Sequence, residues 1–323
     1  MEFGLGSCRL TDGEEMRRLV VAGPDAAWAA RLTKLLGHKS PVYFGHIAAA
    51  LERPLDDLQT LFYVGKVGET PMTVAMVTGA HGAGILGHVY TVPEWRRRGA
   101  STGLFGAMEA DVRARGYRLL TLGTNPDGHA RRIYERMGFR QILPGSGDMQ
   151  WSVGPPTAPE GAVSMGPVRW DDWGWMSAAA AAPTVEGEDL PRSRSMGVGG
   201  AAHLESGFLA ALEQARPLTV LRRAGAAVGW LGLSRTDAAV LGAVVALDFY
   251  LRPECVGSVA PLLGAVEWPD RPVVCALGGG SGYKAAALRQ VGFVPSAPID
   301  ALDGRVLWAR RAPAVPSGGA REA

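Results

Sequence analysis

A short run of basic and small residues in the first half of the chain could hold an anion. It reads Arg-Arg-Arg-Gly-Ala-Ser-Thr over residues 96–102, after a strand-like stretch and before apolar residues at helical spacing. Small side chains let the backbone approach a ligand closely, and the free N–H groups at a helix N-terminus favour phosphate. An ordinary strand–helix turn with three solvated arginines has the same pattern, so these residues alone leave both interpretations open.

A second pattern lies in residues 125–139, where a tyrosine stands one turn before a predicted helix end. Tyr134 precedes Gly138 and Phe139, a glycine and apolar residue typical of a helix C-terminus. An aromatic residue at helical spacing usually packs in a core. A tyrosine hydroxyl near a reacting group can also donate a proton, so Tyr134 has two possible roles.

Together, the loop and this ending resemble the GCN5-related N-acetyltransferase (GNAT) superfamily. The family's pyrophosphate signature, Gln/Arg-x-x-Gly-x-Gly/Ala, is matched at Arg96 and Gly99 and departs at Ser101, a small residue that still allows close approach. The resemblance covers nearly all of residues 1–153. It implies acetyl-CoA, or another acyl-CoA, as co-substrate, and no metal.

The resemblance also implies roles for individual residues. Backbone N–H groups of Val89, Tyr90 and Thr91 would bind the pantetheine arm and polarise the thioester carbonyl. The loop would hold the pyrophosphate, and Tyr134 would protonate the departing sulfur. The cofactor-binding residues expected on this basis are Val89, Tyr90, Thr91, Arg96, Arg97, Arg98, Gly99, Ala100, Ser101, Thr102, Asn125 and Asp127.

An acceptor amine must lose a proton to attack, so catalysis needs a base, which can act through water. We take His88 as the first candidate because it lies in the predicted reactive strand and an ordinary imidazole titrates near neutral pH. A lone strand histidine is nevertheless more often structural. Asp127 stands where the family often has an asparagine, seven residues before Tyr134, and Asn125 could serve instead. The weaker candidate bases are Tyr90, His46, His129 and Asp127.

Composition and charge exclude several other classes of protein. The 323 residues carry 33 basic and 31 acidic side chains, a net charge of +2, which gives no reason to expect a nucleic-acid or anionic-membrane partner. The apolar run 238–247 is too short to span a bilayer. The three cysteines lack CxxC spacing, which argues against a disulfide framework and a zinc site. With no readable secretory signal, we expect a cytoplasmic protein.

Periodicity predicts the elements that position these motifs. In the first half, strands are expected at 8–11, 61–66, 72–78, 85–92 and 119–122, and helices at 14–22, 25–36, 42–51, from 102 onward, and at 130–137. In the second half, strands are expected at 218–223, 228–234, 244–251 and 273–277, and helices after Glu254 and at 283–291.

Two sequence echoes predict that the second half repeats the fold of the first. Residues 134–139 are echoed at 288–293, and 90–94 at 250–254, with offsets of 154 and 160 residues. We therefore expect an α/β protein of two tandem GNAT folds, each a mixed, mainly antiparallel sheet flanked by helices. The expected divisions are an N-terminal domain 1–153, a Pro-rich linker 154–162, a degenerate C-terminal domain 163–311 and a disordered tail 312–323.

The second copy lacks the residues that would bind a cofactor. Its loop, 252–261, has no arginine–glycine spacing and carries Pro261 in the expected helix start, and Leu288 stands where the first half has Tyr134. We expect it to bind acetyl-CoA poorly or not at all, and to serve in packing or as a wall of the acceptor pocket. A loose GxGxxA pattern at 197–202 lacks a preceding strand and is expected to be a loop. Trp170, Trp173 and Trp175 are expected in the core.

The function predicted from these patterns is acyl transfer from acyl-CoA to the amine of a small molecule, catalysed in the first half. The organisation is similar to that of two-domain members of the superfamily such as mycothiol synthase and the tandem protein of clavulanic-acid gene clusters. Alternatives are a non-catalytic acyl-CoA-binding module, an acyl-CoA decarboxylase, or an O- or S-acyltransferase. The acceptor's identity and the oligomeric state stay open.

Overall fold

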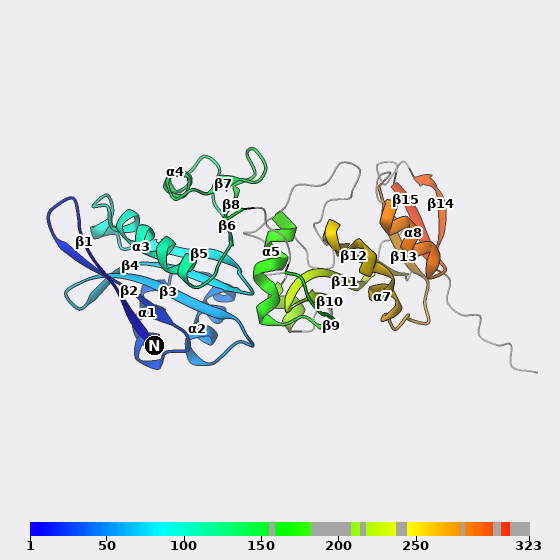
Figure 1. The fold of residues 1–323 in the computed structure, drawn as a ribbon, viewed down its shortest axis with the longest axis horizontal. Coiled ribbons are helices and arrows are strands. Elements are labelled where there is room, and N and C mark those ends of the chain that lie inside the picture. The colour runs from blue at the N-terminus through cyan, green and yellow to red at the C-terminus, as the bar shows by residue number, and fades with distance from the viewer. Residues whose placement is uncertain are drawn as a thin grey trace, which may run out of the picture.

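The computed structural model consists of two β-sheets with helices packed against them (Figure 1). It describes residues 1–154, 159–181, 208–213, 218–236, 244–278, 282–299 and 305–310. In the described residues, the strand order is β1-β2-β3-β4-β5-β6-β8-β7 in the first sheet and β14-β15-β13-β12-β11-β10-β9 in the second. No described helix is both long enough and apolar enough to cross a membrane.

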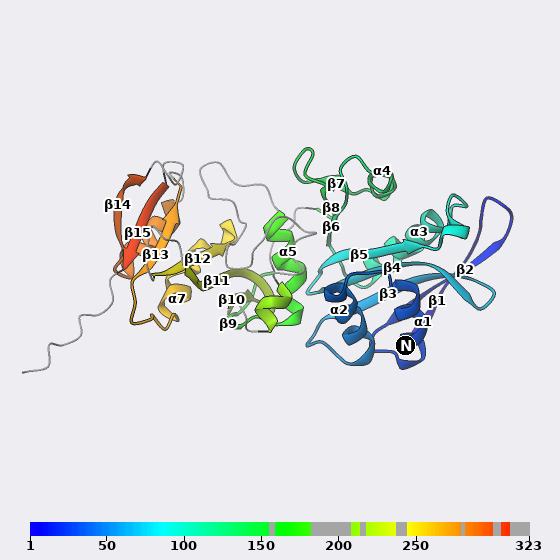
Figure 2. The same ribbon diagram turned by 180° about the vertical axis from the view of Figure 1, so that it is seen from behind.

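The first sheet is covered on both faces. Helices α1 and α2 lie on one face and α3 on the other (Figures 1 and 2). Alternate residues of β3 therefore point into different cores: Leu61 and Tyr63 to the α3 side, Phe62 and Val64 to the α1–α2 side. The elements are β1 (Glu2–Arg9), β2 (Glu15–Ala22), α1 (Ala26–Leu36), α2 (Pro41–Glu52), β3 (Gln59–Val67), β4 (Thr70–Ala80), β5 (Ala83–Thr91), η1 (Pro93–Trp95), α3 (Ala100–Ala114), β6 (Leu119–Gly123), α4 (His129–Arg136), β7 (Arg140–Gln141) and β8 (Asp148–Ser152).

The second sheet repeats this topology. In both sheets one parallel pair, β5 with β6 and β12 with β13, interrupts an otherwise antiparallel order. The expected α/β class, with two mixed, mainly antiparallel sheets, is confirmed. The elements are β9 (Val163–Pro167), η2 (Trp170–Asp172), α5 (Trp173–Ala181), β10 (Leu218–Arg223), β11 (Ala226–Thr236), β12 (Val244–Leu251), η4 (Pro253–Ser258), α7 (Val259–Gly264), β13 (Val273–Leu277), α8 (Gly282–Gln290), β14 (Val294–Ile299) and β15 (Arg305–Arg310).

The structure contradicts one predicted helix. Within the predicted helix 14–22, Glu15–Ala22 form strand β2, which pairs with β1 on one side and β3 on the other. Both neighbours satisfy its backbone groups, and the β-branched Val20 and Val21 are buried in opposite cores. The first strand is also longer than expected, covering Glu2–Arg9 instead of 8–11, because it pairs along most of β2.

Other boundaries differ less. Helix α3 begins at Ala100, two residues before the expected start. The helix expected after Glu254 is a 3-10 segment followed by the six-residue α7, which contains Pro261. Residues 155–158 of the expected linker, the 197–202 pattern and the expected tail 312–323 lie outside the described residues. The division into two domains stays a prediction.

Helix α5 joins the two sheets. A Cβ on Gly174 would lie 2.3 Å from the carbonyl oxygen of Ala83, so only glycine lets α5 approach β5 this closely. The hydroxyls of Thr121 and Ser177 are 3.0 Å apart, and the indole N–H of Trp175 donates to the carbonyl of His81 at 3.1 Å. The three tryptophans at 170, 173 and 175 pack in or against this core, as expected.

Two buried carboxylates of η2 lie at the same junction, and His81 is the partner of one of them from the first half of the chain. Arg169 and His81 both contact the fully buried carboxylate of Asp171, and Arg222 bonds to Asp172 at 2.5 and 2.7 Å. Burial alone would raise the pKa of Asp171, but the hydrogen bonds from His81 and Arg169 outweigh burial and hold that pKa well below its ordinary value. The carboxylate therefore stays ionised between the two sheets.

Candidate active site

Strands β5 and β6 separate after a short parallel contact. Their pairing covers three residue pairs, from Ala83 with Leu119 to Ile85 with Thr121. Beyond Ile85, β5 continues to Thr91 with β4 as its partner strand in the described part of the chain. In Figure 1 the two strands diverge, with β6 leading to α4. The edge of β5 that faces away from β4 is thus available to an extended ligand.

A bulge in β5 turns His88 toward α2. The register between β4 and β5 shifts between Val74 and Met76, and His88 has a positive φ of 50°. Leu86 and Val89 both pack on the α3 side of the sheet. The His88 ring instead lies 5.8 Å from that of Tyr43 on α2. The bulge therefore gives the strand a titratable side chain on the α2 face.

The end of β5 is tied to the start of α3 by hydroxyl groups. The Oγ1 of Thr91 lies 2.7 Å from that of Thr73 on β4 and 2.9 Å from the Oγ of Ser101. The N–H of Val92 donates to the carbonyl of Met72 on β4. Because N–H directions alternate along a strand, the Thr91 N–H points to the open edge and the Tyr90 N–H points to β4.

Helix α3 begins with N–H groups that have no partner among the described residues. Its N-cap, Gly99, has a φ of +82° and supplies no capping side chain, and the first intrahelical bond runs from the Gly103 N–H to the Gly99 carbonyl. The N–H groups of Ala100, Ser101 and Thr102 precede that bond and are available to an anion. The left-handed backbone at residue 99 explains why glycine stands there.

The three loop arginines differ in their surroundings. Arg96 donates to the carbonyl of Thr91 at 3.0 Å and lies over the Tyr90 ring. Arg98 pairs with Asp12 at 2.7 Å. Arg97 is exposed and makes no ion pair or hydrogen bond with any described residue. Its guanidinium is therefore the one in this loop that a ligand can bind without displacing a protein partner.

Tyr134 packs against Phe105 of α3 and keeps its proton. Its ring lies 6.1 Å from both Phe105 and Phe139, and its hydroxyl has no hydrogen-bond partner in the described residues. Burial raises the pKa of Tyr134 to about 12. The phenol is therefore protonated at neutral pH, as a general acid must be.

Asn125, one of the expected cofactor-binding residues, has a structural role in the loop before α4. The side-chain oxygen of Asn125 accepts from the N–H of Asp127 at 3.0 Å, which closes a turn before the helix. Both residues are exposed, and so is His129 at the first position of α4. The amide of Asn125 is thus committed to the turn, although its N–H₂ group can still donate.

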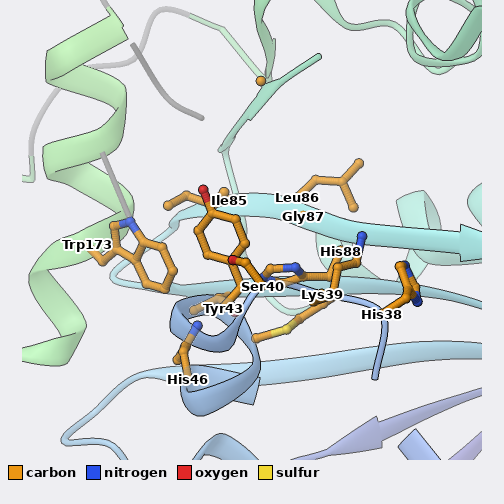
Figure 3. Close-up of a pocket in the computed structure, with 13 residues that line it drawn as sticks. His38, Lys39, Ser40, Tyr43, His46, Ile85, Leu86, Gly87, His88 and Trp173 are labelled. Atoms are coloured by element: carbon orange, nitrogen blue, oxygen red, sulfur yellow. The ribbon is translucent and has the colours of Figure 1, made fainter. Parts of the chain in front are cut away.

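A cavity of about 350 Å³ lies on the α2 face of β5 (Figure 3). Figure 3 shows Trp173 reaching it from α5, while Tyr43 and His46 come from α2. His46 is buried, with its ring stacked on Trp170 and edge-on to Trp173. The polar and aromatic residues that line the cavity are His38, Lys39, Ser40, Tyr43, His46, Thr78, His88 and Trp173.

This cavity contains residues that sequence reasoning did not select. Tyr43, Lys39 and Ser40 belong to a dense polar and aromatic run, 38–46, which covers the connection between two predicted helices and the start of the second. This clustering of polar and aromatic residues is the sequence feature that could have indicated a ligand site. Desolvation, followed by the charge of Lys39, lowers the pKa of His38 from its ordinary value. The neutral form of His38 is therefore favoured at the cavity wall.

The corresponding part of the second sheet is built differently. Arg252 bonds to Glu254 at 2.7 Å and lies over the Trp175 ring. Its positive charge is therefore paired within the protein. A 3-10 segment precedes α7, and Leu288 is fully buried in the core. Among the described residues, no group of three or more His, Cys, Asp or Glu side chains could hold a metal ion.

Comparison with known proteins gives one family match. The family described as FR47-like protein matches residues 63–146, the stretch that contains β5, the arginine loop, α3 and Tyr134. This match covers the two motifs on which the GNAT resemblance rests. No curated protein matches the chain.

Solved structures with acetyltransferase names resemble parts of the chain. The GNAT domain of S. lividans PAT is 14% identical, covering 46% of this chain and 96% of that one, with a TM-score of 0.36. The ribosomal-protein-S18-alanine N-acetyltransferase from Escherichia coli is 14% identical, covering 43% and 99%, with a TM-score of 0.34. A probable N-acyltransferase from Enterococcus faecalis V583 is 13% identical, covering 72% and 58%, with a TM-score of 0.34. Similarities this distant do not assign an activity.

Proposed function

We propose that the chain is an acyl-CoA-dependent N-acyltransferase whose reaction takes place at the first sheet. The observation that carries the proposal is the open edge of β5, flanked by the uncapped N-terminus of α3 and by the α2-side cavity. An open strand edge can bind the amide groups of a pantetheine arm, and a helix N-terminus can bind its pyrophosphate. The FR47-like match over residues 63–146 supports the same function.

The proposed cofactor contacts follow from the groups that are available. The N–H of Thr91 would bond to the pantetheine arm, and the N–H groups of residues 100–102 to the pyrophosphate. Arg97 would add a charge-assisted contact. Tyr90 would contribute through its ring, which lies between His38 and Arg96, because its N–H points to β4.

The reaction would form a bond between the amine nitrogen and the acyl carbonyl carbon and break the carbon–sulfur bond. The amine gives up one proton, for which His88 is the candidate base, directly or through water. The departing sulfur takes up one proton, for which Tyr134 is the candidate acid because its phenol is protonated. Acetyl is the expected acyl group, and a small-molecule amine is the expected acceptor.

The experiment is to incubate the full chain with acetyl-CoA and a pool of small amines, and to measure free thiol and acetylated products by mass spectrometry. Thiol release that depends on an amine, with a matching N-acetyl product, supports the proposal. CoA binding with no thiol release from any amine would favour a non-catalytic binding module. Parallel incubations offer alcohols and thiols as acceptors, or replace acetyl-CoA by a carboxyacyl-CoA. An O- or S-acetyl product would favour an O- or S-acyltransferase, and loss of CO₂ from the carboxyacyl-CoA would favour a decarboxylase.

A further inference from the structure

The turn between β1 and β2 packs against the loop that precedes α3. The N–H of Thr11 donates to the carbonyl of Arg98 at 3.0 Å, and the carboxylate of Asp12 pairs with the Arg98 guanidinium at 2.7 Å. The other carboxylate oxygen of Asp12 accepts from the N–H of Glu14, so the same side chain closes the turn. The Cζ of Arg98 also lies 4.7 Å from the centre of the Trp95 ring. Arg98 is thus held through both its backbone and its side chain.

A second contact joins the same hairpin to α3. Arg18 on β2 donates to the carbonyl of Ser7 on β1 at 2.8 Å and to the carbonyl of Gly103 in α3 at 3.2 Å. The Cys8 side chain lies against the same turn of the helix, because a Cβ on Gly103 would be 2.7 Å from its sulfur. The hairpin therefore contacts both the loop and the first turn of α3.

The loop that these contacts hold has an unfavourable backbone. Arg97 has a φ of +62° and Gly99 a φ of +82°, so Arg98 lies between two residues in the left-handed region. That region is open to glycine but costs free energy for a residue with a side chain such as Arg97. A conformation of this kind persists only where surrounding contacts hold it. The bonds from Thr11 and Asp12 act on the residue between the two.

We propose that the β1–β2 turn is part of the cofactor site, and that Asp12 is a positioning residue that acts on the pyrophosphate contacts through Arg98. The proposal rests on the proposed acyl-CoA-dependent function. The N–H groups of residues 100–102 reach one anion together only if the loop directs the start of α3 toward it. Arg98, which the family resemblance assigns to the cofactor, would instead hold the loop in that conformation.

Removal of the Asp12 charge distinguishes positioning from simple electrostatics. If Asp12 acted only through its charge, Asp12→Asn would tighten binding of acetyl-CoA, because a negative charge near the phosphates disappears. If Asp12 positions the loop, the same change weakens binding. In calorimetric titrations of the full chain, we expect the Kd for acetyl-CoA to rise about two- to fivefold, the range for an exposed ion pair.

Truncated acyl donors show whether the effect passes through the pyrophosphate. Thiol release is measured with acetyl-CoA, with acetyl-dephospho-CoA, which keeps the pyrophosphate and lacks the 3′-phosphate, and with S-acetylpantetheine, which lacks both. We expect Asp12→Asn to lower kcat/KM about two- to fivefold for the first two donors and to leave that for S-acetylpantetheine unchanged. The kcat at saturating acetyl-CoA should not change, because Asp12 does not contact the reacting atoms.

Glu109→Gln is the matched control. Glu109 pairs with Arg113 on α3 at 2.9 Å, and Arg113 lies over the Trp151 ring as Arg98 lies over that of Trp95. The two pairs are similarly exposed, with side chains 39 and 34% accessible in the first and 47 and 35% in the second. The control removes the same kind of ion pair away from the loop, so the Kd and kcat/KM for every donor should stay as in the wild type.

The outcomes separate the two proposals. Unchanged or tighter acetyl-CoA binding by Asp12→Asn, or the same loss in Glu109→Gln, would overturn the positioning role and leave N-acyl transfer intact. An equal loss with S-acetylpantetheine, together with a melting temperature below that of Glu109→Gln, would make Asp12 a residue of the fold alone. Failure of the wild-type chain to bind acetyl-CoA would overturn the proposed function, and this inference with it.

Discussion

The hydroxyl oxygens of Thr91 and Ser101 lie 2.9 Å apart, which links the last residue of β5 to the first turn of α3. The open strand edge and the helix N-terminus are thus held in a fixed relation. One ligand can contact both only if that relation persists. A short bond between two surface elements therefore positions the pantetheine and pyrophosphate contacts of the proposed site.

Thr91→Val should weaken acetyl-CoA binding about three- to tenfold, since a hydrogen bond of this kind contributes about 1 kcal/mol. Ser101→Ala should have a similar effect, and the double variant should lose little more than either single one. Calorimetric titration of the wild type, the two single variants and the double variant with acetyl-CoA gives the double-mutant cycle. Fully additive losses would mean that the two hydroxyls act independently.

Tyr134→Phe should lower kcat about 10²- to 10⁴-fold, the usual contribution of a general acid. The KM for acetyl-CoA should change little, because the ring still packs against Phe105. Burial raises the pKa of the phenol to about 12, so the acid form persists well above pH 10, and the wild-type rate should show no loss from this group between pH 7 and 10.

The matched control for Tyr134 is Tyr117→Phe. Tyr117 is also buried, and its hydroxyl donates to the carbonyl of Gly79 at 3.2 Å. This variant should lose about 1 kcal/mol of stability and keep its turnover. If Tyr134→Phe behaves in the same way, Tyr134 is a packing residue and water protonates the thiolate.

Gly174→Ala should loosen the junction between the sheets. The added methyl would meet the backbone of Ala83, which cannot move aside as a side chain could, so α5 must shift away from β5. We expect a lower melting temperature and a raised KM for the acceptor, because Trp173 moves with α5. The KM for acetyl-CoA should not change. Gly264→Ala, where a Cβ meets nothing within 4 Å, is the control.

Asp171→Asn should destabilise the chain at pH 7 by about 1.5–3 kcal/mol, the range for hydrogen bonds to a charged group. The folded pKa of Asp171 lies below its unfolded value of about 3.9, so the contribution is present above that pH and is lost as the pH falls further. Thermal melts should therefore show the difference from wild type shrinking below about pH 4. Asp57→Asn, on an exposed carboxylate, should change stability little.

Local patterns were sufficient to predict most elements of the fold. Strand β13 has the predicted bounds, and α1 and α2 are within two residues of theirs, because apolar periodicity and turn residues mark them. Strand β2 was not recognisable, since its pattern of Met16, Leu19 and Val20 also suits a helix. Its pairing with β1 and β3 is a long-range effect that no local window contains.

The parts of the site that are continuous in sequence could also be predicted, whereas the parts that depend on long-range contacts could not. The Gly99 loop and Tyr134 could be identified because each motif is continuous in sequence. The cavity could not, because it joins residues of α2, β4, β5 and α5, and its wall includes Trp173, about 95 positions after Thr78. A tryptophan at the start of an apolar helix indicates a core residue, and nothing in its sequence neighbourhood indicates that it also faces a cavity of the other half.

The most direct test of acyl-CoA binding at the first sheet is a calorimetric titration of the full chain with acetyl-CoA. We predict one binding site per chain. Gly99→Pro, which cannot adopt the φ of +82°, should abolish binding, whereas the corresponding Gly257→Pro in the second copy should leave it unchanged. Two equivalent sites, or full binding by a folded Gly99→Pro protein, would contradict the assignment of the cofactor to the first sheet.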